Sequence, residues 1–145
     1  GRLAQLLNGQ ASRVVLADET LQMTLQARLK DGLRPVCAQV ERLPFPSRSF
    51  TRIIMVDALH HVTHQPQTIQ ELWRVLAPGG RIVIEEPDIR VFAVKLIALA
   101  EKLALMRSHF LSPPQIQNLF AFPDAVLSSQ TENGIAWVIA EKLPA

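Results

Sequence analysis

Cysteine, tyrosine and other aromatic residues are scarce in this sequence of 145 residues. It has one cysteine, no tyrosine, and an aromatic content of 6%. The single cysteine, Cys37, excludes an internal disulfide bond and fits a reducing compartment. Its apolar neighbours predict a buried core position and not a nucleophile. We therefore expect a cytoplasmic protein that is not held together by disulfides.

Charge and long apolar runs are limited as well. The net charge is only +2, and no run of lysine or arginine predicts binding to nucleic acid. The longest apolar stretch, residues 91–106, is interrupted by Lys95, Glu101 and Lys102, so it does not resemble a membrane span. The hydrophobic content of 48% and the length predict a single domain over residues 1–145 with a core of its own.

A helix followed by a sharp turn and a strand is the clearest pattern present. Four apolar residues recur at helical spacing: Ile69, Leu72, Trp73 and Leu76. Pro78 cannot continue this helix, and Gly79 and Gly80 permit the positive φ that reverses the chain. The apolar residues 82–84 then predict a short strand that is buried on both faces.

Strands and helices alternate along the rest of the chain. The predicted strands are residues 14–17, 35–38 and 52–56, and the predicted helices are residues 1–9, 21–29, 89–111 and one that begins at Ser112. Residues 125–129 and 135–141 predict an antiparallel hairpin around Asn133 and Gly134. The alternation predicts an α/β fold with a doubly wound, mostly parallel sheet.

Three segments are similar to class I S-adenosylmethionine-dependent methyltransferases. They are Glu71-Leu72-Trp73-Arg74-Val75-Leu76 with Pro78-Gly79-Gly80 and an apolar strand, the loop Leu43-Pro44-Phe45 with Ser49-Phe50, and Leu59-His60-His61. The closest subgroup acts on small molecules and includes the quinone-biosynthesis C-methyltransferases. The resemblance covers nearly the whole chain and implies a Rossmann-like sheet closed by a C-terminal antiparallel hairpin.

The same resemblance implies S-adenosylmethionine as cofactor and a set of residues that hold it. In the family an acid at the end of the second strand binds the ribose hydroxyls, and Asp18 stands there; by itself such an Asp also suits a helix cap. Gln39 replaces the family's acid at the adenine, and its carbonyl would accept without charge assistance. The cofactor-binding residues predicted in this way are Gly1, Asp18, Glu19, Met23, Gln39, Val40, Met55, Val56 and Asp57.

The resemblance also bears on the first residues. Gly1 matches the last glycine of the family's Gly-x-Gly-x-Gly turn, so the strand before that turn has no counterpart here. In the family that strand lies in the middle of the sheet, and without it two inner strand edges would lack partners. We expect either an incomplete record of a longer chain or a fragment rebuilt by strand exchange, and both alternatives stay open.

His60 and His61 are the predicted catalytic residues. Imidazole suits general acid–base work near neutral pH, and Glu86 and His109 are expected on the opposite wall of the acceptor site. Alternatively, the two histidines shape the pocket or cap the helix that Pro66 enters. A metal site is not expected, since His60, His61 and His64 lack a fixed ligand spacing and acidic partners.

The predicted helix over residues 89–111 carries an apolar stripe: Phe92, Leu96, Leu99, Leu103, Met106 and Phe110. One interpretation is a helix that covers the core. The other is a lid or dimer surface that presents these side chains to an apolar acceptor.

The sequence thus predicts methyl transfer from S-adenosylmethionine to a small apolar or aromatic acceptor. The expected partners are that small molecule and a second copy in a homodimer, without nucleic acid or a membrane span. The alternative is an inactive methyltransferase-like protein with an interaction or regulatory role. A nicotinamide-dependent Rossmann dehydrogenase is disfavoured, because such enzymes lack the Pro-Gly-Gly turn and the terminal hairpin.

Overall fold

The computed structural model describes residues 11–30, 32–103 and 108–145. The chain falls into two compact units that divide between Pro44 and Phe45. The helix predicted over residues 1–9 lies outside the described residues. None of the described helices combines the length and the apolar character that crossing a membrane requires.

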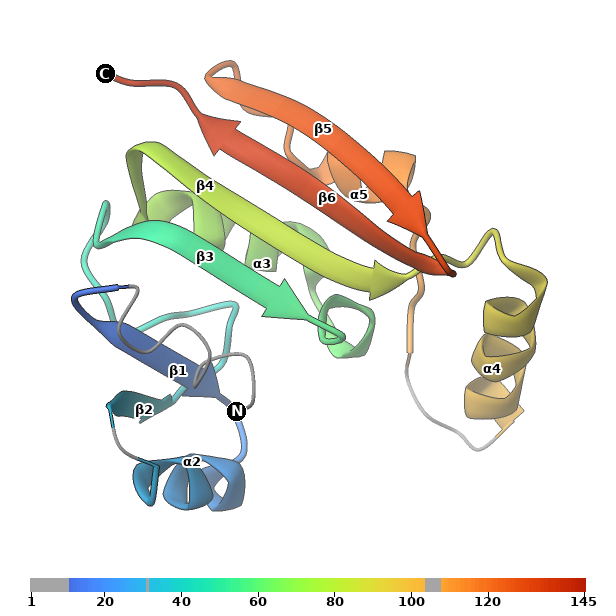
Figure 1. The fold of residues 1–145 in the computed structure, drawn as a ribbon, viewed down its shortest axis with the longest axis horizontal. Helices are drawn as coiled ribbons and strands as arrows, with labels where there is room; N and C mark the ends of the chain where they lie inside the picture. The colour runs from blue at the N-terminus through green and yellow to red at the C-terminus, as the bar shows by residue number, and fades with distance from the viewer. Residues whose placement is uncertain (1–10, 31, 104–107) are drawn as a thin grey trace. The chain divides into compact units, whose positions relative to one another are not determined.

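The described residues of the first unit form two parallel strands and one helix. Strands β1 (Val14–Asp18) and β2 (Leu33–Cys37) pair along their whole length, and α2 (Leu21–Arg28) connects them (Figure 1). These elements confirm the predicted strand–helix–strand order. The residues that α2 buries are Thr24 and Ala27, whereas its regularly spaced leucines are exposed.

Cys37 does not occupy the core position that its apolar neighbours predicted. Its thiol is free and exposed, and it lies 3.5 Å from the backbone carbonyl oxygen of Glu19. The prediction is wrong because Cys37 is the last residue of β2, and among the described residues of this unit α2 is the helix that packs against β1 and β2 and leaves Cys37 exposed.

The second unit is built on a four-stranded sheet. Its order is β3-β4-β6-β5, with β3 (Phe50–Val56), β4 (Leu76–Pro87), β5 (Ala125–Glu132) and β6 (Ile135–Lys142). Strand β4 runs parallel to β3 and antiparallel to β6, and β5 and β6 form the predicted hairpin. Asn133 and Gly134 have φ values of 51° and 80°, as a two-residue type I′ turn requires.

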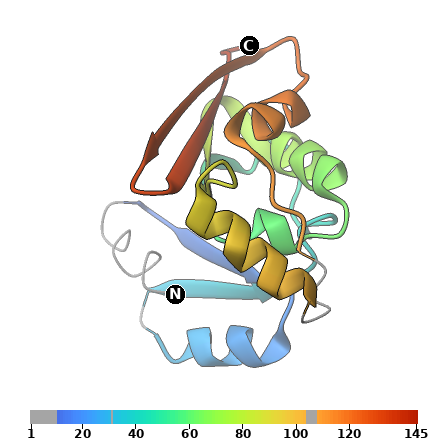
Figure 2. The same ribbon diagram turned by 90° about the vertical axis from the view of Figure 1, so that its right-hand side faces the viewer.

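Helices α3 (Gln65–Val75) and α5 (Pro113–Leu119) cover one face of this sheet (Figure 2). The core between helices and sheet includes side chains with at most 1% of their surface exposed: Ile69, Leu76, Ile82, Ile84, Ile116, Val138 and Ala140. The predicted start of α5 is confirmed, since Gln115 Oε1 accepts hydrogen bonds from the Ser112 backbone and hydroxyl.

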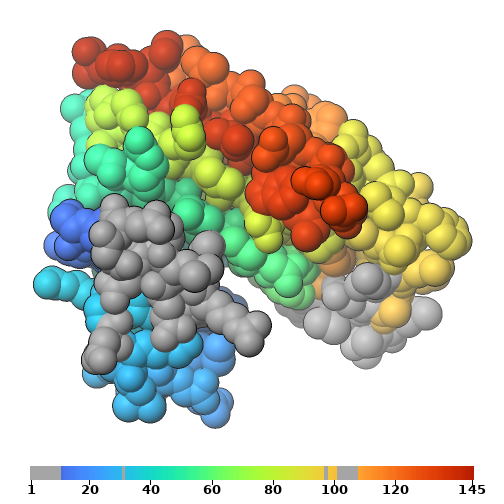
Figure 3. All heavy atoms as spheres, in the orientation of Figure 1, coloured from blue at the N-terminus to red at the C-terminus, as the bar shows by residue number. Residues whose placement is uncertain are grey.

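The turn from α3 into β4 has the predicted geometry. Gly79 has a φ of 72°, and a Cβ on Gly80 would lie 2.7 Å from the Ala77 carbonyl oxygen. Strand β4, however, alternates between buried Ile82 and Ile84 and half-buried Val83. The prediction of two buried faces is therefore wrong, because α3 and α5 pack on one face of the sheet and Val83 is half-buried. Figure 3 shows atoms of these strands at the surface.

Helix α4 (Phe92–Leu103) is shorter than the predicted helix over residues 89–111. Oδ1 of Asp88 accepts the backbone N–H of Arg90 in a turn that delays the start of α4. Residues 108–112 are irregular. Phe92, Leu96 and Leu99 are between 52% and 74% exposed. The interpretation of a core-covering helix is thus wrong for these residues, and the lid or dimer surface stays a prediction.

The α/β class and the C-terminal antiparallel hairpin are confirmed. Within the described part of the chain, β1 pairs only with β2 and β3 pairs only with β4, so there are two separate sheets. The single domain over residues 1–145 and its incomplete N-terminus stay predictions.

Candidate active site

The candidate site lies at the carboxyl end of β3, next to the end of β4. Val56 pairs with Glu85 across these parallel strands, and the Asp57 N–H then donates to the Glu85 carbonyl at 2.9 Å. Asp57 adopts a φ of 49°, which turns the chain sharply. The short 3₁₀ helix η1 (Leu59–His61) follows and brings its side chains beside the end of β4.

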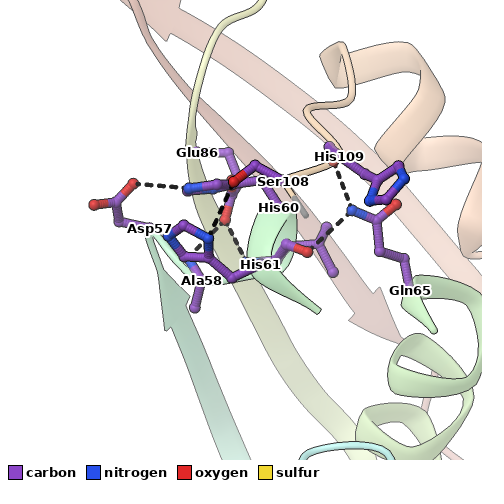
Figure 4. A network of polar contacts seen from close by, with 9 residues as sticks. Asp57, Ala58, His60, His61, Gln65, Glu86, Ser108 and His109 are labelled. Carbon is purple, nitrogen blue, oxygen red and sulfur yellow. Dashed lines mark hydrogen bonds and ion pairs between the residues drawn. The ribbon is translucent and has the colours of Figure 1, made fainter. Parts of the chain in front are cut away.

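The carboxylate of Glu86 is the centre of the site (Figure 4). Glu86 is 3% exposed. Its Oε1 accepts the backbone N–H of Ala58 at 2.9 Å and that of Leu59 at 2.6 Å. Its Oε2 lies 2.5 Å from Nδ1 of His60. One side chain of β4 therefore fixes both the backbone and the imidazole of the turn that follows β3.

His60 is buried by aromatic rings and faces a second carboxylate. It is 3% exposed, and the Phe110 ring stacks on it with the ring centroids 4.3 Å apart. The His61 ring lies 4.0 Å away, centroid to centroid. On the far side of the imidazole, Nε2 lies 3.9 Å from Oδ1 of Asp57, whose side chain is 69% exposed. The imidazole thus has one buried and one solvated carboxylate neighbour.

Gln65 joins this turn to the segment after α4. Its side-chain amide donates to the carbonyls of Leu59 at 3.0 Å and His109 at 2.7 Å, and Gln65 is itself buried. The His109 N–H donates to the His60 carbonyl at 2.7 Å. These bonds hold residues 108–110 against η1 and keep Phe110 over the imidazole.

The two predicted catalytic histidines have different environments. His61 is exposed, and its Nδ1 lies 3.4 Å from the Ser108 hydroxyl. Buried His60 has the carboxylate partner that orients a general base. No group of three metal-binding side chains is present among residues 11–30, 32–103 and 108–145.

Asp88 anchors the chain as it leaves this site. It is 2% exposed and forms a two-pronged ion pair with Arg90, which also donates to the Thr131 hydroxyl at 3.0 Å. The hydrogen bonds from Arg90 hold the pKa of the Asp88 carboxyl below its usual value, although burial acts in the opposite direction. Asp88 thereby ties the end of β4 to the β5–β6 hairpin.

The predicted ribose-binding residue lies at the end of β1 in the first unit. Oδ1 of Asp18 accepts the Thr20 N–H at 2.8 Å. A hollow of about 90 Å³ beside it is lined by Leu16, Asp18, Met23, Gln26, Ala27 and Lys30. This hollow brings predicted Asp18 and Met23 together, but it is smaller than the roughly 300 Å³ at which ligand pockets begin.

The other predicted cofactor residues divide between the two units. Glu19, Gln39 and Val40 belong to the first unit, where Glu19 and Gln39 are exposed and Val40 is half-buried. Met55 and Val56 belong to the second. Gly1 lies outside the described residues.

The residues present fit a nucleoside cofactor. Asp18 Oδ1 is used by Thr20, and Oδ2 has no hydrogen-bond partner among the described residues, so it is available to a sugar hydroxyl. At the end of β3, Val56 is 39% exposed and Met55 half-buried, which suits contact with an apolar ring or chain. Each of these features, taken by itself, suits one part of S-adenosylmethionine.

Gln65 and Phe110 are site residues that the sequence pattern missed. Phe110 matched the helical stripe of residues 92–110 and was assigned to it, whereas it follows an irregular segment. Gln65 precedes Pro66 at the start of α3 and has no pattern of its own. Neither position carries a motif that could have identified it.

Solved structures that superimpose on this chain identify its fold. A protein of Bacillus subtilis, YcgJ, superimposes with a TM-score of 0.82 at 15% identity, covering 100% of this chain and 88% of its own. A possible histamine N-methyltransferase of Thermotoga maritima gives a TM-score of 0.78 at 16% identity, with coverage of 89% and 72%. The chain therefore has the Rossmann-like fold of S-adenosylmethionine-dependent methyltransferases.

The sequence comparison gives the family. Residues 1–84 match the family described as "Methyltransferase domain", and the chain belongs to that family. The ubiquinone/menaquinone biosynthesis C-methyltransferase UbiE of Hahella chejuensis is 37% identical over 87 residues, which are 55% of this chain and 35% of UbiE. The predicted class I assignment is confirmed, and the family implies S-adenosylmethionine as cofactor. The chain spans about a third of the length of such curated relatives.

Proposed function

We propose that this chain contributes to methyl transfer from S-adenosylmethionine to a small apolar or aromatic acceptor, with His60 as the base. The observation that carries the proposal is the buried His60–Glu86 pair at the carboxyl ends of two parallel strands. Ligands of open α/β sheets bind at this end of the strands. A buried imidazole with an orienting carboxylate is suited to accept a proton there.

The residues predicted to contact the cofactor are considered unit by unit, Asp18 and Gln39 in the first and Met55, Val56 and Asp57 in the second. Asp18 would accept hydrogen bonds from ribose hydroxyls and Gln39 one from the adenine amine, while Met55, Val56 and Asp57 would line the cleft. When bound, S-adenosylmethionine supplies a sulfonium methyl group; its bond to sulfur breaks with the electron pair left on sulfur. Alignment of two such reactants is worth roughly 7–11 kcal/mol of the barrier.

His60 would receive the proton that the acceptor loses. When the acceptor carbon or hydroxyl oxygen bonds to the methyl group, its hydrogen leaves as a proton for the imidazole. The nearby carboxylate of Asp57 would favour the resulting imidazolium. Among the described residues, exposed His61 has the Ser108 hydroxyl beside Nδ1 and no carboxylate to orient it, so we assign the role to His60.

An apolar or aromatic acceptor is supported by two observations. The relative UbiE is named as a C-methyltransferase of ubiquinone and menaquinone biosynthesis. In addition, the exposed apolar side chains of Phe92, Leu96 and Leu99 lie on α4, which precedes the segment that touches His60. These side chains suit contact with an apolar molecule.

Cofactor binding and turnover of the full-length protein test this function. Calorimetry with S-adenosylhomocysteine should give micromolar affinity, weakened about tenfold or more by Asp18→Asn because a charged acceptor is lost. Glu132→Gln, at an exposed position of the second unit, serves as the charge-matched control. His60→Ala should keep this affinity and lower methyl transfer about 100-fold or more, whereas His64→Ala should change neither. Unchanged turnover in His60→Ala would remove the base from the proposal.

A second candidate is a methyltransferase-like interaction protein without activity. The exposed stripe of Phe92, Leu96 and Leu99 favours it, since such a surface also suits a protein partner. Absence of binding to both S-adenosylmethionine and S-adenosylhomocysteine by the full-length protein would support this candidate against the enzyme.

A further inference from the structure

Glu86 receives three contacts that restrict how its carboxylate can be used. Oε1 takes the N–H groups of Ala58 and Leu59, and Oε2 faces Nδ1 of His60. All of these contacts lie inside the protein, where Glu86 is 3% exposed. Oε1 therefore acts as an acceptor in both of its contacts, as an oxygen of an ionised carboxylate does.

The ionised form of Glu86 determines where the proton of His60 resides. An ionised carboxylate has no hydrogen to donate, so the short contact requires Nδ1 to be the donor. A neutral imidazole carries one N–H only. Its other nitrogen, Nε2, then holds the lone pair.

Asp57 is the competing carboxylate, and it lies in a weaker position. It is 3.9 Å from Nε2, beyond hydrogen-bond distance, and its side chain is 69% exposed to water. The Glu86 contact is 1.4 Å shorter (3.9 − 2.5) and is screened from water. Glu86 therefore decides the tautomer, and Asp57 adds attraction only once Nε2 is protonated.

Other described neighbours of His60 hold the ring in place. Phe110 stacks on one face, and His61 lies against the imidazole at 4.0 Å between centroids. His109 contacts the His60 carbonyl through its backbone N–H. Glu86, Asp57 and His61 are titratable groups that lie against the imidazole.

We infer that Glu86 is a positioning residue that keeps the proton of His60 on Nδ1 and so makes Nε2 the atom that accepts the proton in the proposed methyl transfer. The kinetic part of this inference rests on the proposed function. The placement of the proton does not, because it follows from contacts within the chain.

Glu86→Gln separates this role from mere support of the fold. The side-chain carbonyl oxygen of this variant can still accept the N–H groups of Ala58 and Leu59. These two hydrogen bonds favour the amide orientation in which the oxygen, and not the NH₂ group, faces Ala58 and Leu59. The amide NH₂ then faces Nδ1 and can only donate, so Nδ1 must accept and the proton must move to Nε2. The shape and backbone contacts are kept while the tautomer is reversed.

Glu85→Gln is the matched control. Glu85 is the preceding residue of β4, and its Oε2 accepts the Trp137 indole N–H at 2.6 Å. Because neighbouring strand residues face opposite sides of the sheet, this variant makes the same change of charge away from His60. The carbonyl of the new glutamine can still accept from Trp137.

The test is ¹⁵N NMR of the histidine side chains at about pH 9, well above the usual histidine pKa of about 6.5. The His60 signals are those that disappear in His60→Gln. We expect a protonated Nδ1 and an unprotonated Nε2 in the wild type and in Glu85→Gln, and the reverse in Glu86→Gln. A wild-type His60 with the proton on Nε2 overturns the inference, and so does a tautomer that Glu86→Gln leaves unchanged. The wild-type spectrum decides even where the variant fails to fold.

Turnover of the full-length protein is the second readout. Glu86→Gln should lower kcat about 100-fold or more, as loss of a general base does, while S-adenosylhomocysteine affinity changes less than about threefold. Glu85→Gln should change neither. Unaltered kcat together with a reversed tautomer refutes the role of Nε2 in catalysis. A wild type without methyl transfer removes the proposed function, and the NMR result then still decides where Glu86 holds the proton.

Discussion

The two compact units differ in what covers their sheets. Among the described residues of the first unit one helix packs on two strands, and the leucines of α2 and its C-cap are half to almost fully exposed. In the second unit two helices pack on four strands, and several core side chains have no exposed surface. Both segments show regular apolar spacing, so spacing alone does not determine burial.

The difference shows that a helix buries its apolar side chains only where a wide enough surface receives them. A pair of strands has little independent stability, whereas three or more strands with a packed face form a core. Helix α3 lies on the wide sheet and buries Ile69, Leu72 and Trp73. Helix α2 has only β1 and β2 beneath it and buries small Thr24 and Ala27.

The largest expected effect is in the second unit. Ile69→Ala removes a side chain with 0% exposure and should lower the free energy of unfolding by about 2–5 kcal/mol, since a cavity is left in the core. Trp73 and Trp137, the two tryptophans of the chain, both lie in this unit, so their fluorescence follows its unfolding in denaturant. A loss below about 1 kcal/mol would mean that removing the Ile69 side chain costs no more than a typical surface substitution.

An intermediate effect is expected at the ion pair of Asp88 and Arg90. Asp88→Asn should cost about 1–2 kcal/mol at pH 7, at the lower end for a buried ion pair because Arg90 is 54% exposed. The lowered pKa of Asp88 means that this stabilisation is present above the usual Asp pKa of about 3.9 and is lost as the pH falls through the folded-state value.

Denaturant unfolding of wild type and Asp88→Asn between neutral and acid pH measures this term. The difference between them should shrink steadily below about pH 4. A difference that stays constant down to pH 2 would show that the carboxylate charge of Asp88 does not contribute. Glu132→Gln on the nearby hairpin is the control for general charge effects, since Glu132 is exposed.

The smallest expected effect is in the first unit. Leu29 is 87% exposed, so Leu29→Ala should change the free energy of unfolding by less than about 0.5 kcal/mol. Circular dichroism in denaturant gives the measurement. A loss above about 1 kcal/mol would indicate that Leu29 is covered in solution, and the contrast with Ile69 would then disappear.

The order of elements could be predicted because turns are marked locally. Pro78 with Gly79 ends one helix, Ser112 with its proline begins another, and Asn133 with Gly134 closes the hairpin. The length of α4 could not be predicted, because the apolar spacing continues to Phe110 while the turn at Asp88 and the contacts of Phe110 depend on distant residues. Burial of Cys37 failed for the same reason, since it depends on what covers the sheet.

The candidate site was predictable in residue type but not in partnership. His60 and His61 stood out by their chemistry and by their place after a strand. That His60 is the buried one depends on Glu86, which is 26 residues away in the chain. Only the parallel pairing of β3 and β4 brings these residues together, and no local pattern encodes that alignment.

The hydrogen bond between Trp137 and Glu85 has a consequence for the alignment of β4. Neighbouring residues of a strand face opposite sides, so a slip of β4 by one position could place Pro87 where Glu86 stands and Glu86 where Glu85 stands. The imidazole of His60 would then lose its carboxylate, and an anion would be exposed on the other side. By fixing Glu85 opposite Trp137, the indole helps to keep the register between β4 and β6. Trp137 would in this way help to ensure that Glu86 is the residue of β4 that lies beside the imidazole of His60.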